Sequence, residues 1–149
     1  MSRVDFSKIA TKYEDYSSVQ KSAAEVLLKL LEIGNTGDVL DLGCGVGNLT
    51  KMIREITKGK VVGVDPSEGM IREAIEKSMG LDITFEVKSA EEIEYKSCFD
   101  VIFCNSSLQW FREPQKAVKN CYTALRKGGR IGIQAPAKRV YSPNSCVFG

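Results

Sequence analysis

Asp41-Leu42-Gly43-Cys44-Gly45-Val46-Gly47 follows directly on the apolar pair Val39-Leu40, and within it apolar residues give way to alternating glycines. Glycine permits positive φ and carries no Cβ, so the chain can turn tightly here and leave bare backbone beside a ligand. In a parallel sheet, the turn after the first strand usually holds a cofactor beyond the carboxyl ends of the strands. The stretch therefore predicts a strand, a glycine turn and a helix that begins near Asn48.

On both sides of this turn, short apolar segments alternate with amphipathic ones at a spacing typical of a parallel sheet covered on both faces. The predicted strands are 39–42, 61–64, 83–87, 99–104 and 130–134, and the predicted helices are 3–16, 18–32, 48–57, 67–79 and 114–126. We expect an α/β fold, with a Rossmann-like, doubly wound and mainly parallel sheet of about five strands. We also expect one domain overall, with N-terminal helices at 1–36 that cover the site, a core at 37–136 and a tail at 137–149.

The residue types that the sequence lacks exclude several kinds of catalytic and metal site. The 149 residues include no histidine, which excludes Ser-His-Asp, Cys-His and histidine-metal sites. The five cysteines never form a Cys-x-x-Cys pair, so we interpret them as buried thiols in a reducing compartment and predict no metal site. No apolar run is long enough to span a bilayer, and the protein is expected to be soluble and cytoplasmic, without a membrane partner.

The charge is unevenly distributed along the chain. None of the 19 acidic residues lies after residue 113, whereas seven of the 21 basic residues do. These seven are not interleaved with aromatic residues as in a nucleic-acid interface, so no nucleic-acid partner is expected. We interpret them as a solvated face, and a site for an acidic partner is the alternative.

Two aspartates near the glycine turn indicate which class of cofactor it binds. Asp65 ends the second predicted strand, where a carboxylate can accept hydrogen bonds from both ribose hydroxyls of an adenosine cofactor. Asp41 precedes the turn and suits a cationic amino group, while the amides at the start of the next helix favour a carboxylate. S-adenosylmethionine carries both groups. A nicotinamide dinucleotide is the alternative, which the Gly-x-Gly-x-Gly spacing disfavours relative to Gly-x-Gly-x-x-Gly.

With these residues in place, the sequence resembles class I S-adenosylmethionine-dependent methyltransferases over nearly its whole length. The motifs that carry the resemblance are Val39 to Gly47, Asp65 with Ser67 and Met70, Ser89-Ala90-Glu91, Phe99 to Asn105, and Leu125 to Arg130. The resemblance implies cofactor contacts at Tyr13, Asp41, Gly43, Cys44, Gly45, Gly47, Asp65, Pro66, Met70, Ser89, Ala90, Glu91 and Asn105.

Individual roles follow from the same resemblance. The turn would line the methionine moiety, Met70 would pack on the adenine, and the backbone of Ala90 would contact the adenine edge. Asn105 would border the reacting methyl group. Ser89 stands where many relatives have an aspartate, and Glu91 would compensate. Tyr13 would either cover the methionine end or pack within the N-terminal helix.

Three further stretches are similar to methyltransferases that act on carboxylates. Phe6 to Tyr13 and Asn105 to Trp110 are similar to malonyl-acyl carrier protein O-methyltransferases. Leu108 to Trp110 and Ile133 to Pro136 are also similar to trans-aconitate methyltransferases. A carboxylate is already ionised, so we predict no catalytic residue beyond those that align donor and acceptor. The acceptor would be a small molecule or carried as an acyl thioester, and the product would be S-adenosylhomocysteine.

The tail after residue 136 is too short for the helix and two strands that complete the family's seven-stranded sheet. We therefore expect a C-terminally truncated fold that lacks the last two strands, and a binding protein without turnover is an alternative to the enzyme. The strand at 130–134 would then be a bare edge, which predicts self-association through residues 130–135.

Overall fold

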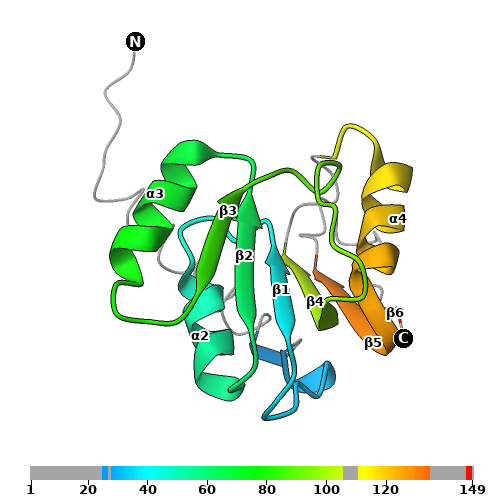
Figure 1. Cartoon of the computed structure of the whole chain (residues 1–149), viewed down its shortest axis with the longest axis horizontal. Helices are drawn as coiled ribbons and strands as arrows, with labels where there is room; N and C mark the ends of the chain where they lie inside the picture. The colour runs from blue at the N-terminus through cyan, green and yellow to red at the C-terminus, as the bar shows by residue number, and fades with distance from the viewer. Residues whose placement is uncertain (1–24, 27, 106–110, 135–146, 149) are drawn as a thin grey trace, which may run out of the picture.

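The computed structural model describes residues 25–26, 28–105, 111–134 and 147–148, and it confirms the predicted α/β fold (Figure 1). The strands are β1 (Val39–Leu42), β2 (Val61–Asp65), β3 (Thr84–Val87), β4 (Phe99–Asn105), β5 (Leu125–Gln134) and β6 (Val147–Phe148). The helices are α2 (Asn48–Ile56), α3 (Glu68–Lys77) and α4 (Pro114–Ala124).

The sheet has the order β3-β2-β1-β4-β5-β6, and every neighbouring pair from β3 to β5 is parallel. The chain runs outward from β1 through β2 to β3, then crosses back to β4 on the other side of β1. This reversal between β1 and β4 is a topological switch point, where a crevice opens beyond the carboxyl ends of the strands. The fold therefore places the glycine turn beside that crevice.

Two apolar clusters cover the two faces of the sheet. Leu40, Leu42 and Ile102 pack with residues of α4 on one face, whereas Val39 and Phe103 pack with Ile53 of α2 and with Leu28 and Leu31 on the other. Because side chains alternate along a strand, Asp41 points to the face covered by α2. The buried carboxylate is therefore placed beneath the turn, next to the first helical turn of α2.

Local signals begin and end the helices close to the predicted positions. Ser67 caps α3, since its Oγ accepts a hydrogen bond from the N–H of Met70 at 3.3 Å, and Pro114 opens α4. At the end of α2, Arg54 donates to the carbonyl oxygens of Thr57 and Gly59 at 2.7 and 2.6 Å. These bonds tie the last turn of α2 to the connection that follows it.

The carboxy-terminal part differs from the prediction in two ways. β5 begins at Leu125, directly after α4, and its pairing with β4 is irregular between Phe99 and Val101. The expected bare edge is wrong for Ile131 and Gly132, which pair antiparallel with Phe148 and Val147 of β6. Self-association, which a single chain does not test, stays a prediction.

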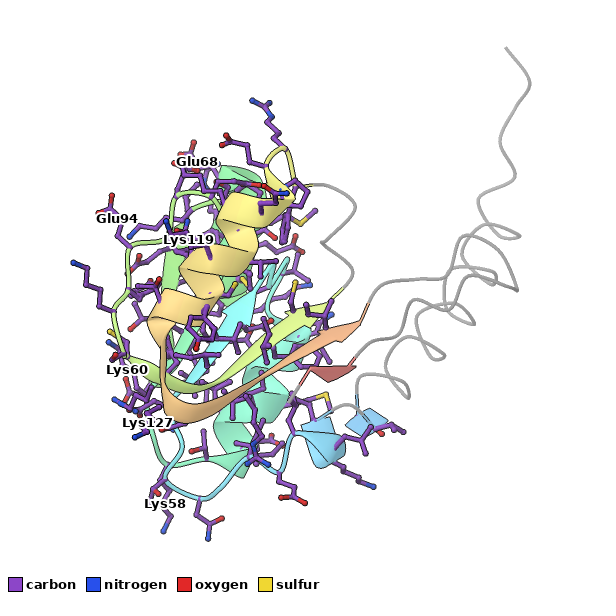
Figure 2. All side chains as sticks on the ribbon, turned by 90° about the vertical axis from the view of Figure 1, so that its right-hand side faces the viewer. Lys58, Lys60, Glu68, Glu94, Lys119 and Lys127 are labelled. Carbon is purple, nitrogen blue, oxygen red and sulfur yellow. The ribbon has the colours of Figure 1, made fainter. Side chains whose placement is uncertain are left out.

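The basic residues near the carboxyl end are partly paired in space with acidic residues from earlier in the chain. Arg126 lies 2.9 Å from Asp38 and 3.0 Å from Asp100, and Arg130 lies 3.3 Å from Glu32. Figure 2 shows Lys119 and Lys127 on the outer surface. Among the described residues, no helix is long and apolar enough to cross a membrane.

Candidate cofactor site

The glycine turn adopts the conformation that its residues predict. Gly43, Gly45 and Gly47 all have positive φ, at 75°, 56° and 84°. A Cβ at Gly47 would lie 3.2 Å from the ring of Phe85 and 3.3 Å from Ala74, whereas a Cβ at Gly45 would meet nothing within 4 Å. Gly47 therefore allows α2 to pack closely, while Gly45 leaves open backbone on which a ligand can lie.

The backbone of the turn is tied to the neighbouring strand. The amides of Gly43 and Cys44 both donate to the carbonyl oxygen of Val64, at 2.8 and 2.9 Å. The amide of Gly45 donates to Oδ2 of Asp65 at 2.9 Å. Burial raises the pKa of the Cys44 thiol, so this cysteine is a neutral packing group within the turn.

Asp65 joins the turn to the start of α3. Its Oδ1 accepts the N–H of Ser67 at 2.9 Å, while its Oδ2 accepts the N–H of Gly45. Each carboxylate oxygen has a second lone pair, so the side chain can still accept hydrogen bonds from two ribose hydroxyls. These bonds fix the carboxylate before a ligand arrives.

Asp41 is buried beneath the turn with one oxygen unsatisfied. Its Oδ2 accepts a hydrogen bond from the Thr50 hydroxyl at 2.6 Å, but its Oδ1 is buried without a partner among the described residues. Burial raises the pKa of Asp41 to about 7; the bond from Thr50 lowers the pKa, and the charge of Asp65 raises it. A buried acceptor without a donor is costly, and the cationic amino group of S-adenosylmethionine is a donor that fits it.

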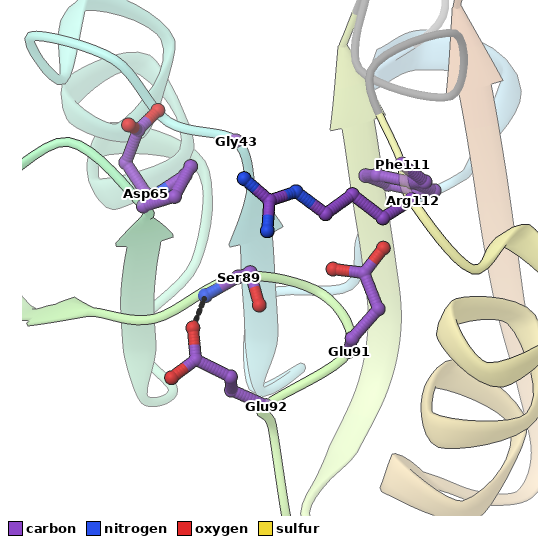
Figure 3. A pocket seen from close by; sticks show the side chains of 8 residues that line it. Gly43, Asp65, Ser89, Glu91, Glu92, Phe111 and Arg112 are labelled. Atoms are coloured by element: carbon purple, nitrogen blue, oxygen red, sulfur yellow. Dashed lines mark hydrogen bonds between the residues drawn. The ribbon is translucent and has the colours of Figure 1, made fainter.

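A cavity of about 560 Å³ opens at the carboxyl end of the sheet (Figure 3). Its volume lies in the usual range for small-molecule sites. One side is made by Gly43 with Asp65 and Pro66, and together with the turn at 41–47 we call this side the turn wall. The other side, here the loop wall, consists of residues 88–92 with Phe111 and Arg112, and it includes the remaining described residues that line the cavity.

Side-chain hydrogen bonds to backbone groups hold the loop wall in place. Glu92 accepts the N–H of Ser89 at 3.0 Å, and this bond lowers the pKa of Glu92. Asn120 of α4 donates through Nδ2 to the carbonyl oxygens of Ala90 and Glu91, at 3.1 and 3.0 Å. The segment predicted to contact the adenine is therefore attached to α4.

The structure brings together many of the residues predicted from the sequence. Gly43, Asp65, Pro66, Ser89 and Glu91 line the cavity directly. The residues Asp41, Cys44, Gly45, Gly47 and Ala90 lie in the turn or loop that bounds it, behind the lining residues. Their contacts with a cofactor stay predictions.

Three predicted residues are not placed at the cavity. Met70 lies in the first turn of α3 with 45% of its surface exposed, and it is not a lining residue. Asn105 is the last residue of β4, but the structure does not describe its side chain. Tyr13 lies outside the described residues, as does most of the segment predicted to cover the site.

Sequence reasoning missed three residues that line the cavity, namely Glu92, Phe111 and Arg112. Glu92 directly follows the predicted Ser89-Ala90-Glu91 motif. The other two belong to the connection between β4 and α4, which starts at the same edge of the sheet as the glycine turn. The rule that ligands bind beyond the carboxyl ends of the strands is the signal that could have found them. The described residues contain no group of three metal-ligating side chains.

Comparison with known proteins gives consistent results. The family described as "Methyltransferase domain" matches residues 39–129. The malonyl-[acyl-carrier protein] O-methyltransferase of Acetivibrio thermocellus is 30% identical over 143 residues, which cover 94% of this chain and 50% of that protein. The trans-aconitate 2-methyltransferase of Variovorax paradoxus is 32% identical, with 85% and 49% covered. The chain thus spans about half the length of these curated relatives.

Solved structures agree on the fold. The crystal structure of a SAM dependent methyltransferase from Aquifex aeolicus is 26% identical with a TM-score of 0.75, and the match covers 95% of this chain and 79% of that one. An S-adenosylmethionine dependent methyltransferase from Mesorhizobium loti is also 26% identical, with a TM-score of 0.68 and coverage of 76% and 53%.

Proposed function

Because the chain belongs to the methyltransferase domain family, we propose that it binds S-adenosylmethionine between the turn wall and the loop wall and directs methyl transfer to a carboxylate. The observation that carries this proposal is the cavity that joins Gly43 and Asp65 to Ser89 and Glu91. Residues from three of the family motifs meet there, although they are far apart in the sequence.

The residues present fit this cofactor group by group. Asp65 presents a fixed carboxylate for the ribose, and Gly45 offers open backbone for the methionine moiety. The unsatisfied Oδ1 of Asp41 supports a cationic group near the turn. The acidic residues Glu91 and Glu92 add negative charge at the loop wall, which suits a sulfonium ligand.

When bound, S-adenosylmethionine supplies a methyl group on an already activated leaving group. The task of the protein is then to hold donor and acceptor in line and to exclude water. A carboxylate acceptor needs no proton removed, which is consistent with a chain that has no histidine. The names of the relatives, malonyl-[acyl-carrier protein] O-methyltransferase and trans-aconitate 2-methyltransferase, support the same acceptor class.

Calorimetric titration with S-adenosylmethionine, S-adenosylhomocysteine and reduced nicotinamide cofactors tests the first half of the proposal. We expect the two sulfur compounds to bind and the nicotinamides not to bind. Binding of a nicotinamide alone would contradict the proposal and favour an oxidoreductase instead.

Transfer of a labelled methyl group to malonyl thioesters and to trans-aconitate tests the second half. The alternative is a chain that binds the cofactor without turnover. Binding without transfer to either carboxylate would favour that alternative.

The proposal also covers the cellular location and the partners of the protein. We expect a cytoplasmic location, which is supported by the free thiols of Cys44, Cys98 and Cys121. We expect the partner to be a small or carrier-bound carboxylate rather than a nucleic acid or a membrane. Self-association through the part of β5 beyond Gly132 is a further expectation.

A further inference from the structure

The charges that line the cavity are uneven. Asp65, Glu91 and Glu92 contribute carboxylates, whereas Arg112 contributes the single cationic side chain among the described lining residues. Figure 3 shows the Arg112 side chain extended from beside Phe111 into the cavity, toward Gly43 and Ser89. The guanidinium is thus placed where a ligand would lie.

Within the described part of the chain, Arg112 has no hydrogen-bond or ion-pair partner. Other cations nearby are engaged: Lys88 lies 2.9 Å from Glu86, and Lys116 lies 3.9 Å from Glu113. A guanidinium has five N–H donors in a planar fork that matches a carboxylate. No described residue therefore occupies the donors of Arg112, and they are available to a ligand.

In the turn wall, the backbone amides of Gly43, Cys44 and Gly45 are already bonded. The amides of Gly43 and Cys44 are both directed to Val64, and that of Gly45 is directed to Asp65. A ligand carboxylate that enters beside these residues would meet bonded amides on one side and acidic side chains on the other. A guanidinium complements such a carboxylate, and Arg112 is in position to supply it.

We propose that Arg112 is the carboxylate-binding residue of the cavity. The proposal rests on the function proposed above and identifies the anionic group that this site recognises. The carboxylate has two chemical sources, the amino-acid end of the cofactor and the methyl acceptor. In either case two parallel hydrogen bonds from the guanidinium would fix its orientation.

The test compares Arg112→Gln and Arg112→Lys with wild type in titrations of S-adenosylhomocysteine and of its decarboxylated analogue, which keeps the amino group. A malonyl thioester and its methyl ester are then titrated into the protein saturated with S-adenosylhomocysteine. Lys116→Gln is the matched control, because it removes one exposed positive charge from α4 without changing the cavity lining. Arg112 is exposed and unpaired among the described residues, so its variants should fold like wild type, as thermal unfolding will verify.

If the cofactor supplies the carboxylate, Arg112→Gln lowers the affinity for S-adenosylhomocysteine at least fivefold and the affinity for the decarboxylated analogue less than twofold. If the acceptor supplies the carboxylate, the affinity for the malonyl thioester falls at least fivefold and the affinity for its methyl ester does not fall. Arg112→Lys should recover part of the loss, and Lys116→Gln should change neither ligand. Unchanged binding of both carboxylates to Arg112→Gln would overturn the role of Arg112 alone. Failure of wild type to bind S-adenosylhomocysteine would overturn the proposed function and this inference together.

Discussion

The two walls of the cavity are built in different ways. The turn wall is held mainly by backbone amides that donate to Val64 and Asp65 at the end of the adjacent strand. The loop wall has no regular secondary structure at 88–92 and is held by side chains, above all by Asn120 from 30 residues further along the chain. The first wall is fixed by strand pairing, whereas the second depends on where α4 packs.

This difference indicates how the site divides its tasks. A backbone-built wall varies little with the side chains around it, so it suits the parts of a cofactor that do not change. A wall made of side chains on a loop and a helix terminus can change residue by residue, and loops carry specificity for this reason. We therefore expect the turn wall to dominate cofactor affinity and the loop wall to tune recognition.

Asp65→Ala gives the largest expected effect, because Asp65 both braces the turn and is predicted to bind the ribose. Loss of this charge-assisted acceptor should weaken S-adenosylhomocysteine binding by about 1–3 kcal/mol, measured by calorimetry. Asp38→Ala is the control: the Asp38 carboxylate also accepts a backbone N–H, that of Lys60 at 2.6 Å, but it lies at the opposite end of the sheet. Asp38→Ala should lower the melting temperature and leave affinity unchanged. Equal affinity losses in both variants would remove Asp65 from the site.

The next test uses two glycines with similar backbones. Gly45 and Gly80 have φ of 56° and 86°, and a Cβ on either would meet nothing within 4 Å. Alanine at each position should cost about 1–2 kcal/mol of folding free energy from left-handed strain, measured by urea unfolding. Only Gly45→Ala should also weaken the cofactor, by about tenfold or about 1.4 kcal/mol, since its methyl group would occupy open backbone at the turn. Equal affinities for both variants would show that the ligand does not lie on Gly45.

The sequence predicted the turn wall far better than the loop wall, and the reason is physical. The positive φ angles of Gly43, Gly45 and Gly47 follow from residue type and spacing alone, because only glycine adopts them without strain. Arg112 and Asn120 are ordinary residues: Arg112 lies just before the amphipathic helix α4, and Asn120 lies within it. Their roles depend on the rotation and position of α4 over the sheet, which local sequence does not specify.

The same contrast applies at the carboxyl end. The alternation of strands and helices correctly predicted β1 to β4 and the second half of β5, since each of these segments is marked by its own apolar run. The pairing of β6 with β5 was missed because Val147 and Phe148 form a strand of only two residues, too short for a periodic signal.

Measuring the affinity for S-adenosylhomocysteine from pH 5.5 to 8.5 distinguishes the two walls by the charges they carry. The pKa of Asp41 is raised from 3.8 to about 7, so the folded chain keeps a proton that the unfolded chain releases. The contribution of Asp41 to the stability of the ligand-free protein therefore falls as pH rises from about 4 to about 7. A cationic ligand group favours the ionised form, so affinity should be about tenfold lower at pH 6 than at pH 8. Glu92, whose pKa is lowered, stays ionised throughout this window and contributes no such step.

Thr50→Val sharpens the pH test. The Thr50 hydroxyl lowers the pKa of Asp41 through its hydrogen bond, so removing it should move the midpoint of the affinity profile to higher pH. A flat profile in wild type, or a midpoint that Thr50→Val leaves unchanged, would show that Asp41 does not sense the ligand.

Asn120→Asp gives the smallest expected effect on affinity and tests the loop wall alone. The substitution keeps the side-chain shape but replaces the donor to Ala90 and Glu91 with a carboxylate that repels both carbonyl oxygens. Affinity for S-adenosylhomocysteine should fall by about 0.5–1.5 kcal/mol. The control Thr123→Val removes a hydrogen bond to Lys119 within the same helix and should leave affinity unchanged.

Two ligands that differ in the base show whether Asn120 contributes to recognition of the adenine. Ala90 is predicted to contact the adenine edge, so Asn120→Asp should reduce the preference for S-adenosylhomocysteine over S-inosylhomocysteine, which carries hypoxanthine. Asp65→Ala should weaken both ligands equally, because the ribose is common to them. If Asn120→Asp also weakened both equally, the loop wall would hold only the shape of the cavity. Base recognition would then have to come from residues that do not depend on α4, and the contrast between the two walls would be one of construction and not of function.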